Sequence, residues 1–241
     1  MAMSEIDAQI QKLDPDRWLS SRFIAEPQVR EDVLAVYAYD HELARAPRVA
    51  SNPLLGEIRL VWWREALDEI YGDKAVRLHP AAQALAQCVR RRKLPRDPLE
   101  AMIEARLSEL DGVADSPEAA LAWARGSAGQ AAVAAAQILD PAADASRALD
   151  PGALWALARR AGEAGQGQDA SGEAQPAQGG AYAQAFAQLL GEARSQARRL
   201  SAAAFPAVAH AALARLRASG ARPADWRLQL RLIGAVAFGR I

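Results

Sequence analysis

Apolar residues recur along this chain at the three- and four-residue spacing of helices that bury one side. The segment from residue 27 to residue 45 follows this pattern between Val29 and Ala44. In the next segment, residues 54–71, apolar side chains line two adjacent faces and leave only a narrow polar strip, which predicts a helix buried on two sides. No stretch of any length alternates between apolar and polar residues as a half-exposed strand does, so we expect an all-α fold.

Prolines and Asp or Ser residues, which favour the first turn of a helix, mark the beginning of most other helical segments. The pattern predicts helices at about residues 80–92, 97–110, 117–139 and 151–162, a long one over 181–219 with a kink at Pro206, and a last one over 223–238. Residues 162–180 are rich in Gly, Gln, Ala and Ser and have almost nothing to bury, so we expect a flexible loop there. We therefore interpret residues 1–241 as a single helical domain with that loop.

Composition agrees with closely packed helices and limits the possible functions. Of the 241 residues, 58 are alanine, 26 of the 29 basic residues are arginine, and the formal net charge is zero. Alanine has the highest helix propensity, and a balanced charge argues against binding nucleic acid through a broad basic surface. The first 16 residues lack the parts of a secretory signal, and no apolar run is long enough to span a bilayer. We expect a cytoplasmic protein, with peripheral contact to the inner membrane left open.

Three pieces of sequence in the first third of the chain carry a family resemblance. They are WLSSRF at residues 18–23, VLAVYAY at residues 33–39 and IRLVWWREAL at residues 58–67, and a looser likeness continues over residues 94–139. They resemble the squalene/phytoene synthase family, most closely the divergent branch that includes the mitochondrial complex I assembly factor and its bacterial relatives. The resemblance implies an isoprenoid-synthase-like bundle of helices, shortened in this chain, which agrees with the all-α expectation.

The same resemblance indicates what this chain lacks for catalysis. Active members join two prenyl diphosphates head to head, and Mg²⁺ held by aspartates neutralises the departing diphosphate. Where the resemblance places the carboxylates of the first aspartate motif, this chain has Ala44, Arg45 and Arg48. In the second motif only Glu163 and Asp169 stay as candidate carboxylates. We therefore expect no catalytic residue, no metal site and no resident cofactor, and a non-catalytic role.

Three functions stay open at this point. The first is a scaffold or assembly factor that binds a protein partner, and the resemblance implies a subunit of a respiratory complex such as complex I. The second is an active prenyl-diphosphate transferase in which a rearranged set of acids, Asp40, Glu42, Glu57 and Glu65, holds Mg²⁺. The third is a module that binds an isoprenoid or another lipid in a reduced prenyl pocket.

Five residues are the candidates for a binding site on these hypotheses: Tyr37, Arg45, Arg48, Trp62 and Trp63. The arginines could hold an anion such as a diphosphate, because a guanidinium donates two parallel hydrogen bonds to phosphate oxygens. The aromatic side chains could line a prenyl pocket, although core packing is the simpler explanation of their positions. An open cavity lined by these arginines favours anion or lipid binding, whereas a collapsed one favours a role in protein interaction alone.

Overall fold

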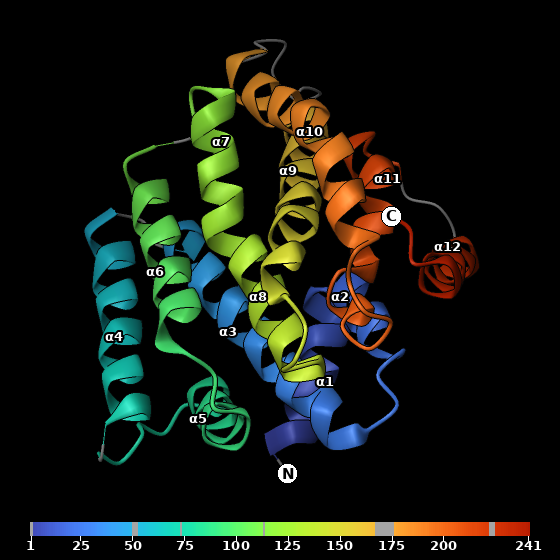
Figure 1. Cartoon of the computed structure of the whole chain (residues 1–241). Helices are drawn as coiled ribbons and strands as arrows, with labels where there is room; N and C mark the ends of the chain where they lie inside the picture. Colours follow the sequence, from blue (N-terminus) through green and yellow to red (C-terminus); the bar gives the residue numbers. More distant parts are fainter. Residues whose placement is uncertain (1, 50–52, 73, 113, 167–175, 222–224) are drawn as a thin grey trace.

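Helices make up the regular structure of this protein (Figure 1). The computed structural model describes residues 2–49, 53–72, 74–112, 114–166, 176–221 and 225–241. Its α-helices are α1 (Ala2–Leu13), α2 (Pro15–Ser21), α3 (Pro27–Val49), α4 (Pro53–Tyr71), α5 (Pro80–Arg92), α6 (Arg96–Leu110), α7 (Pro117–Ala124), α8 (Gln130–Leu139), α9 (Leu149–Gln166), α10 (Pro176–Ala197), α11 (Ala214–Ala218) and α12 (Asp225–Phe238).

Shorter helical turns connect several of these elements. A π-helical turn, Arg125–Gly129, joins α7 to α8, and 3₁₀ turns lie at Ala145–Ala148, Phe205–Ala207 and Ala209–Leu213. No strand occurs among the residues that the structure describes, so the all-α prediction is confirmed. Among the described helices, none combines the length and the apolar character needed to cross a bilayer.

The central helix of the bundle is α3, which contacts α1, α4, α5, α6 and α8. All nine residues from 32 to 40 are buried, so the helix is covered on every side rather than along one stripe. Its acids in this stretch are paired with arginines of other helices, as a buried charge requires. Asp32, for example, accepts hydrogen bonds from Arg91 and Arg92 at the end of α5.

Helix α4 lies at one edge of the bundle, and our prediction that it is buried on two sides was wrong for the first part of the helix (Figure 1). Its inner face, with Leu60, Trp63 and Leu67, is buried against neighbouring helices. The first part of the other apolar face lies in solvent, whereas Ala66 and Ile70 farther along that face are buried. Four large apolar residues of α4 are exposed, Leu54, Leu55, Ile58 and Val61, and we call the last three the α4 stripe.

Small residues allow the helices of the second half to approach closely. A Cβ atom at Gly152 of α9 would lie 2.6 Å from the main-chain oxygen of Ala128 and 2.6 Å from the Cβ of Ala132. A Cβ atom at Gly162 would lie 2.0 Å from the main-chain oxygen of Arg217 in α11. The packing of α9 against α8 and α11 therefore depends on residues without bulky side chains, as the alanine-rich composition suggests.

In the second half of the chain one helix prediction was wrong, and the expected loop lies partly outside the residues that the structure describes. Within the expected loop at 162–180, α9 continues to Gln166 and α10 begins at Pro176, while residues 167–175 lie outside the described part of the structure. The helix expected over 181–219 ends at Ala197, and turns with 3₁₀ geometry follow up to Leu213. Pro206 lies in one of these turns, where its missing N–H group costs no α-helical hydrogen bond.

Candidate functional site

A pocket of about 140 Å³ opens where α2, α3, α6 and α9 meet, and we call it the central pocket. Ala44 and Arg45 both line it. The part of α3 on which the resemblance expects metal ligands therefore still faces a cavity. The charged side chains along its wall are five arginines and three acids: Arg17, Arg45, Arg106, Arg159, Arg160, Asp14, Asp40 and Glu163.

Asp40 is the carboxylate that two buried arginines share in this pocket. Arg17 Nη1 donates to Asp40 Oδ2 at 2.6 Å, and Arg106 Nη2 donates to Asp40 Oδ1 at 3.1 Å. All three residues are buried. Burial alone raises the pKa of a carboxyl group, but here the two guanidiniums outweigh burial and hold the pKa of Asp40 at about 2. Asp40 is thus ionised at neutral pH, and both of its oxygens accept hydrogen bonds from arginine.

Aromatic rings cover the faces of the same arginines. The guanidinium carbon of Arg17 lies 4.3 Å from the ring centroid of Trp155 and 4.9 Å from that of Tyr37. Arg106 lies 5.5 Å from the ring centroid of Trp123. These cation–π contacts replace part of the hydration that a buried guanidinium loses. Such contacts matter here because, in the described structure, Arg17 Nε and Nη2 and Arg106 Nε are buried without a hydrogen-bond partner.

A neutral histidine lies beside this network. His210 is fully buried, and its ring lies edge-on to Trp155 at 5.1 Å and to Tyr37 at 6.3 Å between centroids. Burial, reinforced by the positive charge of Arg17, lowers the pKa of His210 well below its ordinary value. Tyr37 is buried too, and its hydroxyl donates to the main-chain oxygen of Ala207 at 3.4 Å.

Of the two arginines singled out in the sequence, the structure places Arg45 at the central pocket. Half of its side chain is exposed, and its Nη1 donates to the two carboxylate oxygens of Glu42 at 3.1 and 3.2 Å. Arg48 belongs to α3, but its side chain lies outside what the structure describes. Tyr37 is not among the residues that line the central pocket, because its ring packs beneath Arg17 in the core.

Trp62 and Trp63 lie along a different hollow of about 290 Å³, which Arg45 also borders. Trp63 is buried and packs edge-on against Tyr39 at 5.3 Å between centroids. Trp62 is half-buried, and the guanidinium carbon of Arg77 lies 4.4 Å from its ring centroid. Core packing and a cation–π contact account for these positions. The two tryptophans do not share this hollow with Tyr37, as a common prenyl pocket would require.

The acids of the rearranged Mg²⁺ site are not brought together. Asp40 faces the central pocket, whereas Glu42 borders the hollow beside the tryptophans. Glu57 is exposed on α4, and Glu65 pairs with Arg77 at 3.2 Å. Magnesium requires several oxygen ligands that converge on one point. Within the described residues, no group of three or more His, Cys, Asp or Glu side chains could hold a metal ion.

The carboxylates of the central pocket itself offer no better fit for Mg²⁺. Asp14 pairs with Arg17 at 3.7 Å, Asp40 with the same arginine, and Glu163 with Arg159 at 3.6 Å. A divalent cation would have to displace guanidiniums that are themselves buried or half-buried, and each broken pair would leave an uncompensated charge. The donor set therefore suits a structural ion-pair network and does not fit a magnesium cluster.

Sequence reasoning missed the arginines that hold this network, and it considered Asp40 as a ligand of a rearranged Mg²⁺ site. Arg17 and Arg106 come from other helices, α2 and α6, and lie 23 and 66 residues from Asp40 in sequence. One local pattern could have indicated Asp40: it directly follows the apolar run of residues 33–39, where a charge is buried and needs a partner.

Comparisons with known proteins agree with this architecture. The model of the squalene/phytoene synthase family matches residues 10–167. A crystal structure of a dehydrosqualene synthase in complex with ligand has the same all-α isoprenoid synthase fold, with a TM-score of 0.69 and 16% identity over 98% of this chain and 95% of that one. A stretch of 102 residues is 30% identical to NADH dehydrogenase (ubiquinone) complex I, assembly factor 6, of Bos taurus. That stretch spans 42% of this chain and 30% of the bovine protein.

Proposed function

This chain belongs to the squalene/phytoene synthase family, and we propose that it is a non-catalytic member that acts as a scaffold in the assembly of another protein. The observation that carries the proposal is the Asp40 network beside Ala44 and Arg45. Arg17 and Arg106 form ion pairs with both carboxylate oxygens of Asp40, the acid of α3 that is buried at the pocket. The pocket thus has arginine where the synthases of the family have metal-binding carboxylates.

The chemistry of the pocket also argues against synthase activity. A metal ion supplies the Lewis acid that withdraws charge from a departing diphosphate. Arginine binds phosphate oxygens through hydrogen bonds but does not coordinate them, so Arg45 could hold a diphosphate without promoting its departure. The volume of about 140 Å³ is below the roughly 300–1,000 Å³ of common ligand pockets, and two prenyl diphosphates exceed it.

The α4 stripe is the surface that we assign to the protein partner. Leu55, Ile58 and Val61 are 47%, 54% and 41% exposed, and Glu57 and Arg59 lie between them. An apolar centre with charges of both signs around it is typical of protein interfaces, whereas burial of Glu57 in lipid would be costly. The similarity to a bovine complex I assembly factor supports a subunit of that respiratory complex as the partner.

Co-purification tests this role. We expect tagged protein from its own host to recover complex I subunits, and a deletion strain to contain less assembled complex I. Ile58→Asp is expected to reduce recovery by about tenfold or more, because a charge at the centre of an interface is desolvated without a partner. Leu78→Asp is the matched control, since Leu78 is 94% exposed and lies outside the stripe. Normal complex I in the deletion strain, together with no respiratory subunit in the purified material, would refute the scaffold role.

A further inference from the structure

The C-terminal helix α12 has a second exposed apolar face, at the edge of the bundle opposite α4 (Figure 1). Its inner side packs against α2 and the 3₁₀ turn Ala209–Leu213, and buries Leu228, Leu232 and Ala235. Its outer side carries four large apolar residues that are between 51% and 75% exposed, and we call them the α12 stripe: Trp226, Leu230, Ile233 and Phe238. The first three are spaced by four and three residues, so they form one line along the helix.

The charges around this stripe are almost all positive. Arg227 and Arg231 lie one turn apart on the flank between the stripe and the buried side, and Arg240 follows the helix. The single acid of α12, Asp225, lies in its first turn. The guanidinium carbon of Arg227 is 5.2 Å from the ring centroid of Trp226. Of the carboxylates that the structure describes, none forms an ion pair with these three arginines, which contrasts with the mixed charges around the α4 stripe.

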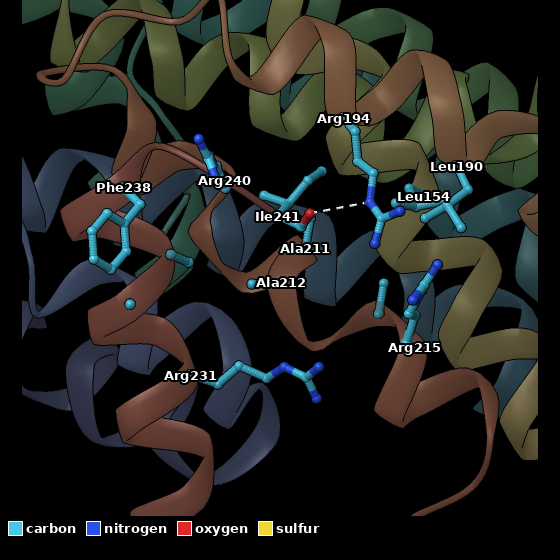
Figure 2. A pocket seen from close by; sticks show the side chains of 13 residues that line it. Leu154, Leu190, Arg194, Ala211, Ala212, Arg215, Arg231, Phe238, Arg240 and Ile241 are labelled. Carbon is cyan, nitrogen blue, oxygen red and sulfur yellow. Dashed lines mark hydrogen bonds between the residues drawn. The ribbon is translucent and has the colours of Figure 1, made fainter.

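A pocket of about 260 Å³ adjoins α12, and we call it the C-terminal pocket. Figure 2 shows Arg194, Arg215 and Arg231 pointing toward this space from three different helices. Among the residues that the structure describes, no Asp or Glu side chain lines this pocket. Arg194 Nε donates to the main-chain oxygen of Ile241 at 3.2 Å. Burial and the like charge of Arg215 lower the pKa of Arg194, so an anion that entered the pocket would relieve a repulsion already present.

The stripe and the pocket form one continuous surface, because Phe238 lines the pocket and Arg231 borders both. A soluble anion would neutralise the arginines but leave the stripe in water. An apolar protein surface would cover the stripe but bring no anion to the arginines. A bilayer with anionic phospholipids supplies both, since headgroup phosphates lie directly above the acyl chains.

We propose that α12 and the C-terminal pocket form a docking surface for a bilayer that contains anionic phospholipids. The helix lies in the plane of the interface, Arg194, Arg215 and Arg231 bind headgroup phosphates, and the side chains of the α12 stripe reach the acyl region below. Helices with arginine on one flank and tryptophan, phenylalanine and leucine on the other bind membranes in this orientation. The proposal does not depend on the scaffold role, because the α4 stripe lies on a different edge of the molecule.

Vesicle flotation with the full chain tests the electrostatic part. We expect binding to phosphatidylcholine vesicles that contain phosphatidylglycerol, weaker binding at high salt, and little binding to phosphatidylcholine alone. The double variant Arg194→Gln/Arg231→Gln should bind about 25-fold more weakly, since each arginine near an anionic surface contributes about a fivefold factor. Arg59→Gln, which changes an exposed arginine of α4, should bind as the unchanged protein does.

Substitutions in the stripe test the apolar part. Ile233→Ser should weaken binding at every salt concentration, whereas Ile58→Ser, at an isoleucine of similar exposure on α4, should not. Brominated lipids should quench the fluorescence of the unchanged protein, and Trp226→Phe should remove most of that quenching. Equal binding to neutral vesicles would overturn the proposal, as would binding of inorganic phosphate without binding of vesicles. A solution dimer that Ile233→Ser abolishes, without vesicle binding, would assign the surface to a second copy of the chain instead.

Discussion

Arginines line both the central pocket and the C-terminal pocket, but their surroundings differ. In the central pocket, Arg17 and Arg106 are buried and share the carboxylate of Asp40. In the C-terminal pocket, Arg194 and Arg231 converge, and the described part of the wall has no Asp or Glu side chain. A buried guanidinium must find its counter-charge within the fold, whereas a half-exposed one can be neutralised by something outside it. The difference teaches that the first set of arginines stabilises the fold and the second is available to a ligand.

Among the variants that test this difference, the removal of Asp40 is expected to change the free energy of unfolding most. In Asp40→Ala, two buried guanidiniums lose their shared carboxylate, and the free energy of unfolding should fall by about 3–5 kcal/mol. Urea denaturation followed by circular dichroism measures this change. Glu42→Ala is the matched control, because Glu42 pairs with the half-exposed Arg45 on the same helix and should cost less than about 1 kcal/mol.

A second variant keeps this prediction testable if Asp40→Ala does not fold. In Asp40→Leu combined with Arg17→Met and Arg106→Leu, all three charges of the network are replaced by apolar side chains. This protein should regain part of the lost stability, because the two guanidiniums no longer lack their shared carboxylate, while Asp14 still loses its ion pair with Arg17. A cost for Asp40→Ala no greater than that for Glu42→Ala would show that the central arginines are not structural.

The pH dependence of stability is expected to show a smaller effect, which originates at His210 beside Arg17. The folded protein holds this histidine neutral, with its pKa below the ordinary value, whereas the unfolded chain protonates it below about pH 6.5. Below about pH 6.5 the unfolded state therefore binds more protons than the folded state does. The stability that neutral His210 contributes is present above about pH 6.5 and is lost as the pH falls. The loss amounts to at most about 1.4 kcal/mol per pH unit for one group.

His210→Phe should remove that slope while keeping a ring against Trp155. The measurement is the free energy of unfolding in urea at several values between about pH 7 and pH 5. His41→Phe is the comparison, because burial lowers the pKa of His41 too, but that residue is only half-buried and lies at the pocket mouth. A slope that persists unchanged in His210→Phe would show that His210 becomes charged within the fold.

The smallest expected effect concerns the arginines of the C-terminal pocket. Arg194→Gln should change the free energy of unfolding by less than about 0.5 kcal/mol, with a slight gain from reduced repulsion of Arg215. Arg106→Gln removes an arginine that pairs with Asp40 in the central pocket. It should lower the free energy of unfolding by an amount several times larger. Thermal unfolding of the two variants side by side makes this comparison. If they were equally destabilised, the distinction between the two pockets would fail.

Much of the fold was predictable because local features determine where helices begin. Six of the described helices begin at a proline, and for four of them the sequence places the first turn close to that residue: Pro27, Pro53, Pro80 and Pro117. A proline fixes φ at a helical value, and its missing N–H group would be unsatisfied in the first turn in any case. The family resemblance read from the motifs at residues 18–67 is confirmed by the family match and by the shared fold.

The failures have a common physical cause, which is that burial and pairing depend on distant parts of the chain. Residues 202–214 are mostly alanine and other apolar types, so their pattern cannot distinguish an α-helix from the 3₁₀ turns that form there. Helix α4 has two apolar faces, and its position at the edge of the bundle decides which one is covered. Of the five candidate site residues, Arg45 lines the central pocket. The arginines that pair with Asp40 there were not among the candidates, because they come from other helices.

The central claim, that the pocket no longer supports synthase chemistry, is tested most directly by incubating the purified full chain with Mg²⁺ and farnesyl or geranylgeranyl diphosphate. Pyrophosphate release is measured over time, and calorimetry with Mg²⁺ is done on the same preparation. We predict no release above the rate without protein, and no heat of Mg²⁺ binding, because guanidiniums occupy the carboxylate of Asp40. Release of pyrophosphate that requires both Mg²⁺ and the protein, with a joined prenyl product, would contradict this claim.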